Sequence, residues 1–187
     1  IDVIMGRKPT FVPKDLLDIA VKAARNIISV AIACGMAGII IGIVTLTGIG
    51  LKFGAGLISI SGGIAIITLL LTMVSSIILG MGSPTTANYL ITSTITAGAI
   101  IGLGFEPLAA HMFAFYFGII ADITPPVALA AIAGAAIAKA RPIKTAFNAT
   151  KLAIGAFIIP YIFVFNPEML MINTTFIQVL PVIITAL

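Results

Sequence analysis

The feature that most constrains this chain is the length of its uncharged stretches. No Asp, Glu, Lys or Arg occurs in the ranges 26–51, 53–105, 123–138 and 152–167. The helices of a water-soluble domain need one polar face, and uncharged stretches of this length do not provide it. A mean hydropathy of +1.26 points the same way. The sequence therefore predicts an all-α integral membrane protein that has the lipid bilayer as a partner.

The positive charges lie mostly in two blocks, residues 7–25 and 139–151, at the ends of apolar stretches. This is the pattern of cytoplasmic segments in multi-pass membrane proteins. The net charge of +4 does not indicate a nucleic-acid partner, because no basic face with interleaved aromatic residues occurs. The chain begins without Met and ends within an apolar run, so we expect a piece of a longer polypeptide.

Residues 1–26 are expected to form a cytoplasmic segment with an amphipathic helix from Pro13. This helix either lies on the membrane surface or extends the next helix, and both alternatives stay open. A first span is predicted over 27–48, because about twenty apolar residues cross the hydrocarbon core. The Gly-rich residues 49–62 are expected to return the chain along the far interface.

A re-entrant helical hairpin is predicted over residues 63–101, with its tip at Gly80–Ala87 (GMGSPTTA). A loop that emerged on the cytoplasmic side would be expected to carry Lys or Arg, and this one has neither. Because both basic blocks are expected on the cytoplasmic side, residues 26–138 must cross the membrane an even number of times. One full span, one re-entrant hairpin and one broken span satisfy that count, and four full spans would satisfy it too.

Residues 107–138 are predicted to form a discontinuous transmembrane helix. As one helix they would be about 48 Å long, which exceeds an ordinary crossing. Pro125-Pro126 cannot lie unbroken inside a helix, so the segment divides into 107–121 and 127–138. A further span is expected over 148–166. Residues 27–168 would then form one repeat, and 169–187 the cut start of another span.

At the first break, Pro84 is predicted to begin the returning helix with Ser83 as its N-cap. The free N–H groups around Thr85, Thr86 and Ala87 would then attract an anion, with the positive end of the helix dipole behind them. The carbonyl groups of residues 78–81, at the end of the incoming helix, would suit a hard cation such as Na⁺.

At the second break, Thr124 is predicted to cap a half-helix that begins at Pro125, which would free the carbonyl groups of residues 121–123. Asp122 is either a functional acid or a structural carboxylate that orders the loop. Asn88 either contacts a ligand or bridges to the second break. His111 is expected to have a capping or packing role, with proton relay as the alternative. Two such breaks predict a binding site near the bilayer midplane.

Three motifs resemble the large membrane component of tripartite ATP-independent periplasmic (TRAP) transporters. They are GMGSPTTANYL at 80–90, EPLAAHMFAFYFGIIADITPPVALAA at 106–131 and IKTAFNATKLAIGAFIIPYIFVFNP at 143–167. The resemblance is greatest to the fused permease branch that works with TAXI-type binding proteins, and it covers the C-terminal half of such a permease.

This resemblance implies an elevator-type secondary transporter in a bacterial or archaeal inner membrane, which imports small organic anions, often carboxylates, with a Na⁺ gradient. The implied partners are a periplasmic TAXI-type solute-binding protein, a small membrane subunit or its fused equivalent, and the N-terminal half of the permease. From the two breaks and the resemblance together, the predicted substrate-binding residues are Ser83, Pro84, Thr85, Thr86, Asn88, Thr124, Pro125 and Pro126. The implied Na⁺ site, formed mostly by backbone carbonyl groups, includes Gly80, Gly82, Asp122 and Thr124.

Three other functions remain as alternatives. The first is a Na⁺-coupled elevator carrier that works without a binding protein. The second is an intramembrane enzyme, which we do not expect because the sequence has no GxSxG motif, no paired carboxylates and no Walker loop. The third is a non-transporting assembly subunit.

Overall fold

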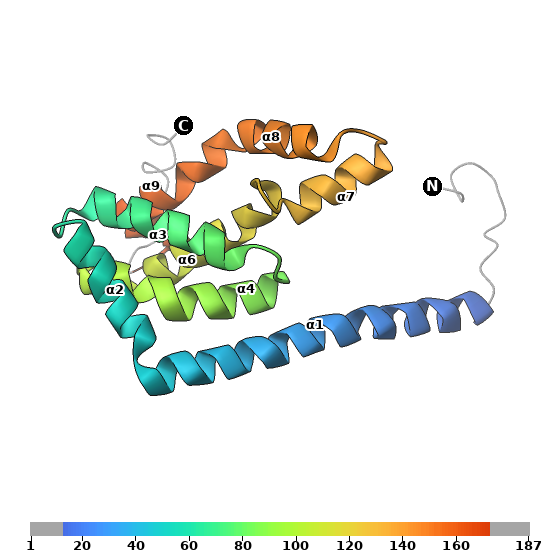
Figure 1. The fold of residues 1–187 in the computed structure, drawn as a ribbon, viewed down its shortest axis with the longest axis horizontal. Helices are drawn as coiled ribbons and strands as arrows, with labels where there is room; N and C mark the ends of the chain where they lie inside the picture. Colours follow the sequence, from blue (N-terminus) through green and yellow to red (C-terminus); the bar gives the residue numbers. More distant parts are fainter. Residues whose placement is uncertain (1–12, 173–187) are drawn as a thin grey trace.

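The computed structural model describes residues 13–172, and within them the chain forms helices and no strands (Figure 1). The prediction of an all-α fold is therefore confirmed. Residues 1–12 and 173–187 lie outside the described part. This leaves the first half of the predicted cytoplasmic segment, and most of the further span predicted over 169–187, without a structural description.

The first helix, α1 (Pro13–Thr47), runs across residue 26 without a break. Residues 13–26 therefore extend the following helix and do not form a separate one. The helix ends where Gly48 takes a left-handed conformation with φ of 66°. By length and composition, Leu16–Thr47 could cross a membrane, and among the described residues one bent pair of later helices would provide a second span.

Residues 49–60 form a helix, α2 (Ile49–Ile60), and whether it returns along the far interface stays a prediction. Gly50 and Gly54 lie one turn apart and face the backbone of residues 94–99. A Cβ atom at Gly50 would lie 2.8 Å from the carbonyl oxygen of Thr94, so only glycine permits this approach. Gly50 and Gly54 are therefore contact points between helices.

The predicted hairpin is present as two helical arms that lie side by side (Figure 1). The first arm is α3 (Ala65–Gly80), and the second is α4 (Thr85–Thr92) followed by a π-helical segment (Ser93–Ala97) and α5 (Gly98–Gly102). The hydroxyl groups of Ser76 and Thr96 are 2.9 Å apart across the two arms, and both residues are buried. Whether this hairpin is re-entrant in a membrane stays a prediction.

The predicted discontinuous helix also has a break at the two prolines. The helix α6 (Pro107–Ile120) ends in a 3₁₀ turn (Ala121–Ile123), and five residues, 124–128, separate that turn from α7 (Leu129–Ile137). Figure 1 shows α7 leading on from α6 beyond this unwound segment. The second part is shorter than predicted, because Ala128 takes a left-handed conformation with φ of 41° and delays the start of the helix.

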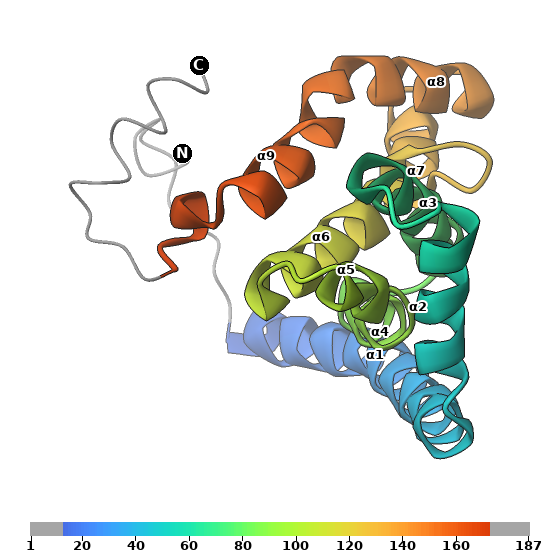
Figure 2. The same cartoon turned by 90° about the vertical axis from the view of Figure 1, so that its left-hand side faces the viewer.

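The span predicted over 148–166 is bent within the described residues, and whether it crosses a membrane stays a prediction. Residues 148–152 belong to α8 (Pro142–Leu152), and the following helical residues, Ile154–Phe165, turn away from it by 62° (Figure 2). This second piece comprises a 3₁₀ turn (Ile154–Phe157) and α9 (Ile159–Phe165), and a 3₁₀ turn at Pro167–Leu170 follows it. Pro160 lacks an N–H group and its ring obstructs the carbonyl group four residues earlier, so a continuous helix is interrupted.

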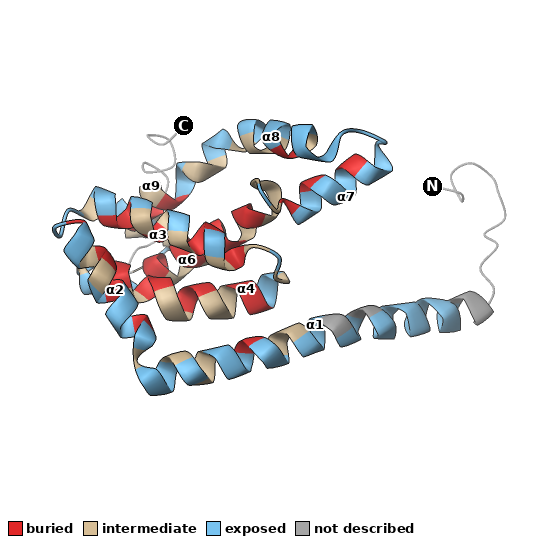
Figure 3. Cartoon of the chain, in the orientation of Figure 1, coloured by how far each residue is buried: buried red, intermediate tan, exposed pale blue. Residues whose placement is uncertain are grey.

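The core lies around α6, which packs against both hairpin arms and α9, and Figure 3 shows buried residues concentrated on α6 and the hairpin. Phe113 and Phe117 are fully buried there and make edge-to-face contacts with each other and with Tyr161 of α9. The outward side chains are mostly large and apolar, and Leu46 of α1 is 89% exposed. Such a surface is unfavourable in water and suits contact with lipid or with other membrane helices.

Replacing a core leucine should destabilise the fold far more than replacing an outward one. Leu69 of α3 is fully buried, so Leu69→Ala should lower the free energy of unfolding by about 2–5 kcal/mol through lost packing. Leu46→Ala is the matched control and should change little, because lipid or detergent replaces its contacts. The measurement is the temperature at which half of the purified full-length protein stays monodisperse in detergent; equal shifts would contradict this packing.

Candidate functional site

The two helix breaks lie next to each other because α3 and α6 come into backbone contact just before them. Gly80 ends α3 and Gly118 is in the last turn of α6, and both are buried. A Cβ atom at Gly80 would lie 2.7 Å from the carbonyl oxygen of Gly118. Glycine is therefore required at the closest approach of the two helices.

Asn88 of α4 joins these two helix ends. Its side chain is fully buried, and its Nδ2 donates hydrogen bonds to the carbonyl oxygens of Gly118 (2.6 Å) and Gly80 (3.2 Å). The structure thus shows the bridging role that the sequence left open. Ligand contact by this side chain stays a prediction, and it would require an atom other than the two N–H groups already used.

The remaining oxygen of Asn88 is an unused acceptor. Within the described residues Oδ1 has no hydrogen-bond partner, and it lies against the backbone of Gly118. A buried oxygen without a donor is unfavourable by about 1–3 kcal/mol. A water molecule or a cation at this point would therefore be stabilised by an oxygen that the helices have already positioned.

At the first break, the prediction that Ser83 caps the returning helix is wrong. Helix α4 begins at Thr85, and Pro84 occupies the N-cap position in an extended conformation with ψ of 148°. The carbonyl oxygen of Pro84 accepts the first helical hydrogen bond, from the N–H of Asn88 (2.9 Å). Gly82 turns the chain with φ of 78°, so the helix start is displaced by one residue.

The tip still exposes the groups that an anion would contact. Thr85 and Thr86 are exposed, and the first N–H groups of a helix have no partner within the helix. Ser83 and Pro84 are partly buried beside them. The positive end of the helix dipole therefore faces outward from the tip.

The carbonyl groups at the end of α3 are not as free as predicted. The oxygen of Gly80 accepts from Asn88, and it also accepts a long hydrogen bond (3.5 Å) from the N–H of Ser83. The oxygen of Ile78 accepts from the N–H of Met81 at 3.4 Å. These long bonds are weaker than ordinary ones, so the oxygens keep capacity for a further partner.

At the second break, the prediction that Thr124 caps a helix beginning at Pro125 is also wrong. The hydroxyl group of Thr124 donates backward to the carbonyl oxygen of Ile120 (2.7 Å) and so closes α6. In the predicted arrangement Pro126 would lie at the second helical position, where it offers no N–H group to the cap and its ring disfavours a helical conformation at Pro125. Residues 124–128 consequently stay unwound.

Two of the carbonyl groups predicted to be free at this break have partners. The oxygen of Ala121 accepts from the N–H of Thr124 (3.2 Å), and that of Ile123 accepts from the hydroxyl group of Thr150 in α8 (2.9 Å). Sequence reasoning missed Thr150, because nothing in its neighbourhood distinguishes it from other helical threonines. It missed Gly118 for the same reason.

Within residues 13–172, no side-chain hydrogen bond involves the remaining candidates at the second break. Asp122 and Pro125 are partly buried, and Pro126 is exposed. The turn Ala121–Ile123 that holds Asp122 lies against α3. Among the described residues, no group of three His, Cys, Asp or Glu side chains is arranged to hold a metal ion. Any cation site here would therefore depend on backbone, hydroxyl and amide oxygens.

His111 contributes to packing between α4 and α6. Its Nδ1 is 3.4 Å from the hydroxyl oxygen of Tyr89, whose ring also makes an edge-to-face contact with Phe115. These contacts lie one helical residue beyond Asn88 and add a second attachment of the hairpin to α6. The expectation that His111 has a capping or packing role stays compatible with this geometry.

A family model described as tripartite ATP-independent periplasmic transporter, DctM component, matches residues 2–177. No curated protein and no solved structure matches the chain. The matched range includes the hairpin, both helix breaks and α8. The family resemblance read from the three motifs is therefore confirmed, whereas the TAXI-type branch and the fused arrangement stay predictions.

Adding a methyl group at Gly118 should disturb the junction. In Gly118→Ala the new Cβ would collide with the amide of Asn88, so we expect a destabilisation of about 1–3 kcal/mol. Gly134→Ala in α7 is the matched control, because no atom lies within 4 Å of its new Cβ. This control should be neutral or stabilising by up to about 1 kcal/mol. Thermal stability of the full-length protein in detergent measures both, and equal behaviour would refute the close approach.

Proposed function

Because the chain belongs to the DctM component family of tripartite ATP-independent periplasmic transporters, we propose that it forms part of a Na⁺-coupled permease for small organic anions. The family is one of integral membrane transporter components and not of enzymes, so the chain belongs to a membrane transporter. We propose carboxylates as the substrate class and a periplasmic TAXI-type binding protein as the source of substrate. A small membrane subunit, or its fused equivalent, and the N-terminal half of the permease would complete the transporter.

The observation that carries this proposal is the junction of the two helix breaks at Asn88. The start of α4 would bind the anion through the N–H groups of Thr85, Thr86 and Ala87. Ser83 and Pro84 from the tip, and Pro125 and Pro126 from the second break, would line the same site. Backbone recognition of this kind suits a carboxylate, which needs donors in a fixed arrangement.

The cation would bind on the other side of the junction, where helix ends present oxygens. Gly80 ends α3, and the turn containing Asp122 ends α6 beside it. We propose that carbonyl groups near Gly80 and Gly82, together with Asp122 and Thr124, hold Na⁺. The unused Oδ1 of Asn88 supports this proposal, because it supplies a buried acceptor between the two helix ends. Unwound carbonyl groups are the usual Na⁺ ligands in such transporters.

Coupling would follow from the shared junction. An anion at the start of α4 and a cation at the end of α3 are attached to the same four-residue tip, Met81–Pro84. Each ion reduces the electrostatic cost of the other, and a tip ordered by one ion is already ordered for the second. Substrate and Na⁺ would therefore bind cooperatively.

We further propose that the hairpin is re-entrant and moves as one body with α6 in an elevator motion. Its first arm has 16 residues and is about 24 Å long, which is short of the ~30 Å hydrocarbon core. Asn88, Tyr89 and the Ser76–Thr96 contact tie the arms to each other and to α6. These attachments favour joint movement over opening of the hairpin alone.

The experiment that tests the proposal measures uptake of labelled organic acids into proteoliposomes containing the full-length permease. Uptake that requires both an inward Na⁺ gradient and the binding protein supports the proposal. Uptake with Na⁺ alone would favour a carrier that works without a binding protein. An uptake rate that is the same with and without the Na⁺ gradient would contradict Na⁺ coupling.

Removing the hydroxyl group of Thr124 should weaken Na⁺ binding. Thr124→Val keeps the shape of the side chain, and loss of one ligand should raise the half-saturating Na⁺ concentration by about tenfold. Thr145→Val is the matched control, since Thr145 also donates to the carbonyl oxygen four residues earlier but lies in α8. A Na⁺ titration of initial uptake rates measures the effect. Equal curves for both variants would remove Thr124 from the site.

A further inference from the structure

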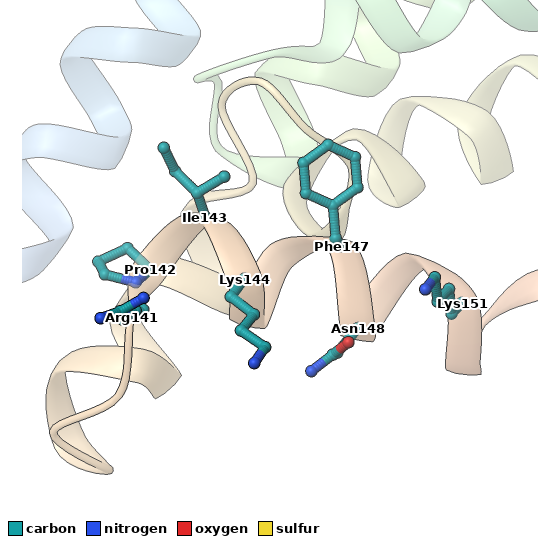
Figure 4. Close-up of a pocket in the computed structure, with 7 residues that line it drawn as sticks. All are labelled: Arg141, Pro142, Ile143, Lys144, Phe147, Asn148 and Lys151. Atoms are coloured by element: carbon teal, nitrogen blue, oxygen red, sulfur yellow. The ribbon is translucent and has the colours of Figure 1, made fainter.

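Helix α8 carries a cationic face that transport does not explain. Lys144 and Lys151 are exposed on this helix, and Arg141 is exposed at its N-cap position. Asn148 lies on the same side as Lys144 (Figure 4). The sequence contains no acidic residue between Asp122 and Glu168, so no neighbour in this segment neutralises these charges.

The same helix exposes large apolar side chains next to the cations. Ile143 is 71% exposed and Phe147 is 55% exposed, and they point to the opposite side from Lys144 and Asn148 (Figure 4). The packing of α8 against α7 uses smaller residues, chiefly Ala146 and Ala149. Ile143 and Phe147 are therefore left for a partner outside this helix pair.

Two adjoining hollows combine these features. The first is lined by Lys144, Lys151, Arg141 and Asn148, with Pro142, Ile143 and Phe147. The second is an apolar groove lined by Phe147, Thr150, Lys151, Ile154 and Phe157. Phe147 and Lys151 belong to both, so a cationic hollow opens directly beside an apolar groove.

The direction of α8 agrees with a position at a membrane surface. The helix is basic and amphipathic, and the apolar residues that follow turn away from it by 62°. If Ile154–Phe165 enters the hydrocarbon, α8 cannot follow the same line. A basic amphipathic helix of this kind lies in the interface, with its apolar side chains at the acyl boundary.

We propose that α8 is a binding site for anionic phospholipid. The phosphate of the headgroup binds Arg141, Lys144 and Lys151, and an acyl chain occupies the groove formed by Phe147, Ile154 and Phe157. Charge complementarity selects the headgroup, and the adjoining apolar groove selects a lipid over a free anion. A nucleic acid or an acidic peptide would use the cations and leave the groove unfilled.

This lipid site is connected to the second helix break. Thr150 lines the apolar groove, and its hydroxyl group donates to the carbonyl oxygen of Ile123 (2.9 Å). A lipid that holds α8 at the surface therefore also holds the backbone beside Asp122. The bound lipid would stabilise the conformation of the second helix break, and this role does not depend on which substrate the transporter carries.

The test is a titration of the detergent-solubilised full-length permease with a fluorescent phosphatidylglycerol, compared with the phosphatidylcholine analogue. Phosphatidylglycerol should bind more tightly. Lys144→Gln and Lys151→Gln should each weaken phosphatidylglycerol binding by about fivefold. Lys52→Gln is the matched control. This substitution also removes one positive charge, but Lys52 is exposed on α2 and does not line the hollow.

Three outcomes would overturn the proposal. Equal affinity for phosphatidylcholine would show that charge plays no part. Equal effects of Lys144→Gln and Lys52→Gln would show a general charge effect and no site on α8. Full competition by millimolar inorganic phosphate would indicate a free-anion site, whereas binding that survives phosphate and falls in Phe147→Ser indicates lipid. Size-exclusion profiles that match the unmodified protein establish that each variant is folded.

Discussion

The hydrogen bonds of Asn88 are the interaction on which the arrangement of this chain depends. Inside a membrane, a helix that stops leaves carbonyl groups that water does not reach, and they must find partners within the protein. One amide side chain satisfies the carbonyl groups of Gly80 and Gly118, which end two different helices. Because both positions are glycine, the backbones can approach closely enough for one side chain to serve both.

The second break uses a related solution with different residues. Thr124 satisfies the end of its own helix, and Thr150 reaches the break from α8. Each break is thus stabilised from a neighbouring element: the first by α4, and the second by α8. In the transport that we propose, ion binding at the tip would act on the end of α6 through Asn88. Lipid binding on α8 would act on the turn that follows α6 through Thr150.

Prediction from the sequence was most successful for the positions of breaks and least successful for their local geometry. Gly82 and the prolines at 84, 125 and 126 mark both breaks, because these residue types cannot continue an ordinary helix. The capping roles given to Ser83 and Thr124 were wrong, because the left-handed conformations of Gly82 and Ala128 displaced the following helix starts. The bend after α8 was missed, because an apolar stretch from 148 to 166 has the same composition whether straight or bent.

The sequence by itself determined that the chain is helical and membrane-embedded, where the two breaks at Pro84 and Pro125-Pro126 lie and which family it belongs to. Those properties follow from the covalent chemistry of individual residues and from the absence of charge over long stretches. Only the tertiary structure decided that Asn88 bridges Gly80 to Gly118, that Thr150 reaches Ile123 and that the cations of α8 lie beside an apolar groove. Asn88 and Gly118 are 30 positions apart, and Thr150 and Ile123 are 27 positions apart, so their spacing in the sequence does not show that they meet. The hollows beside α8 depend on the 62° bend that follows this helix, which the composition of the segment does not reveal.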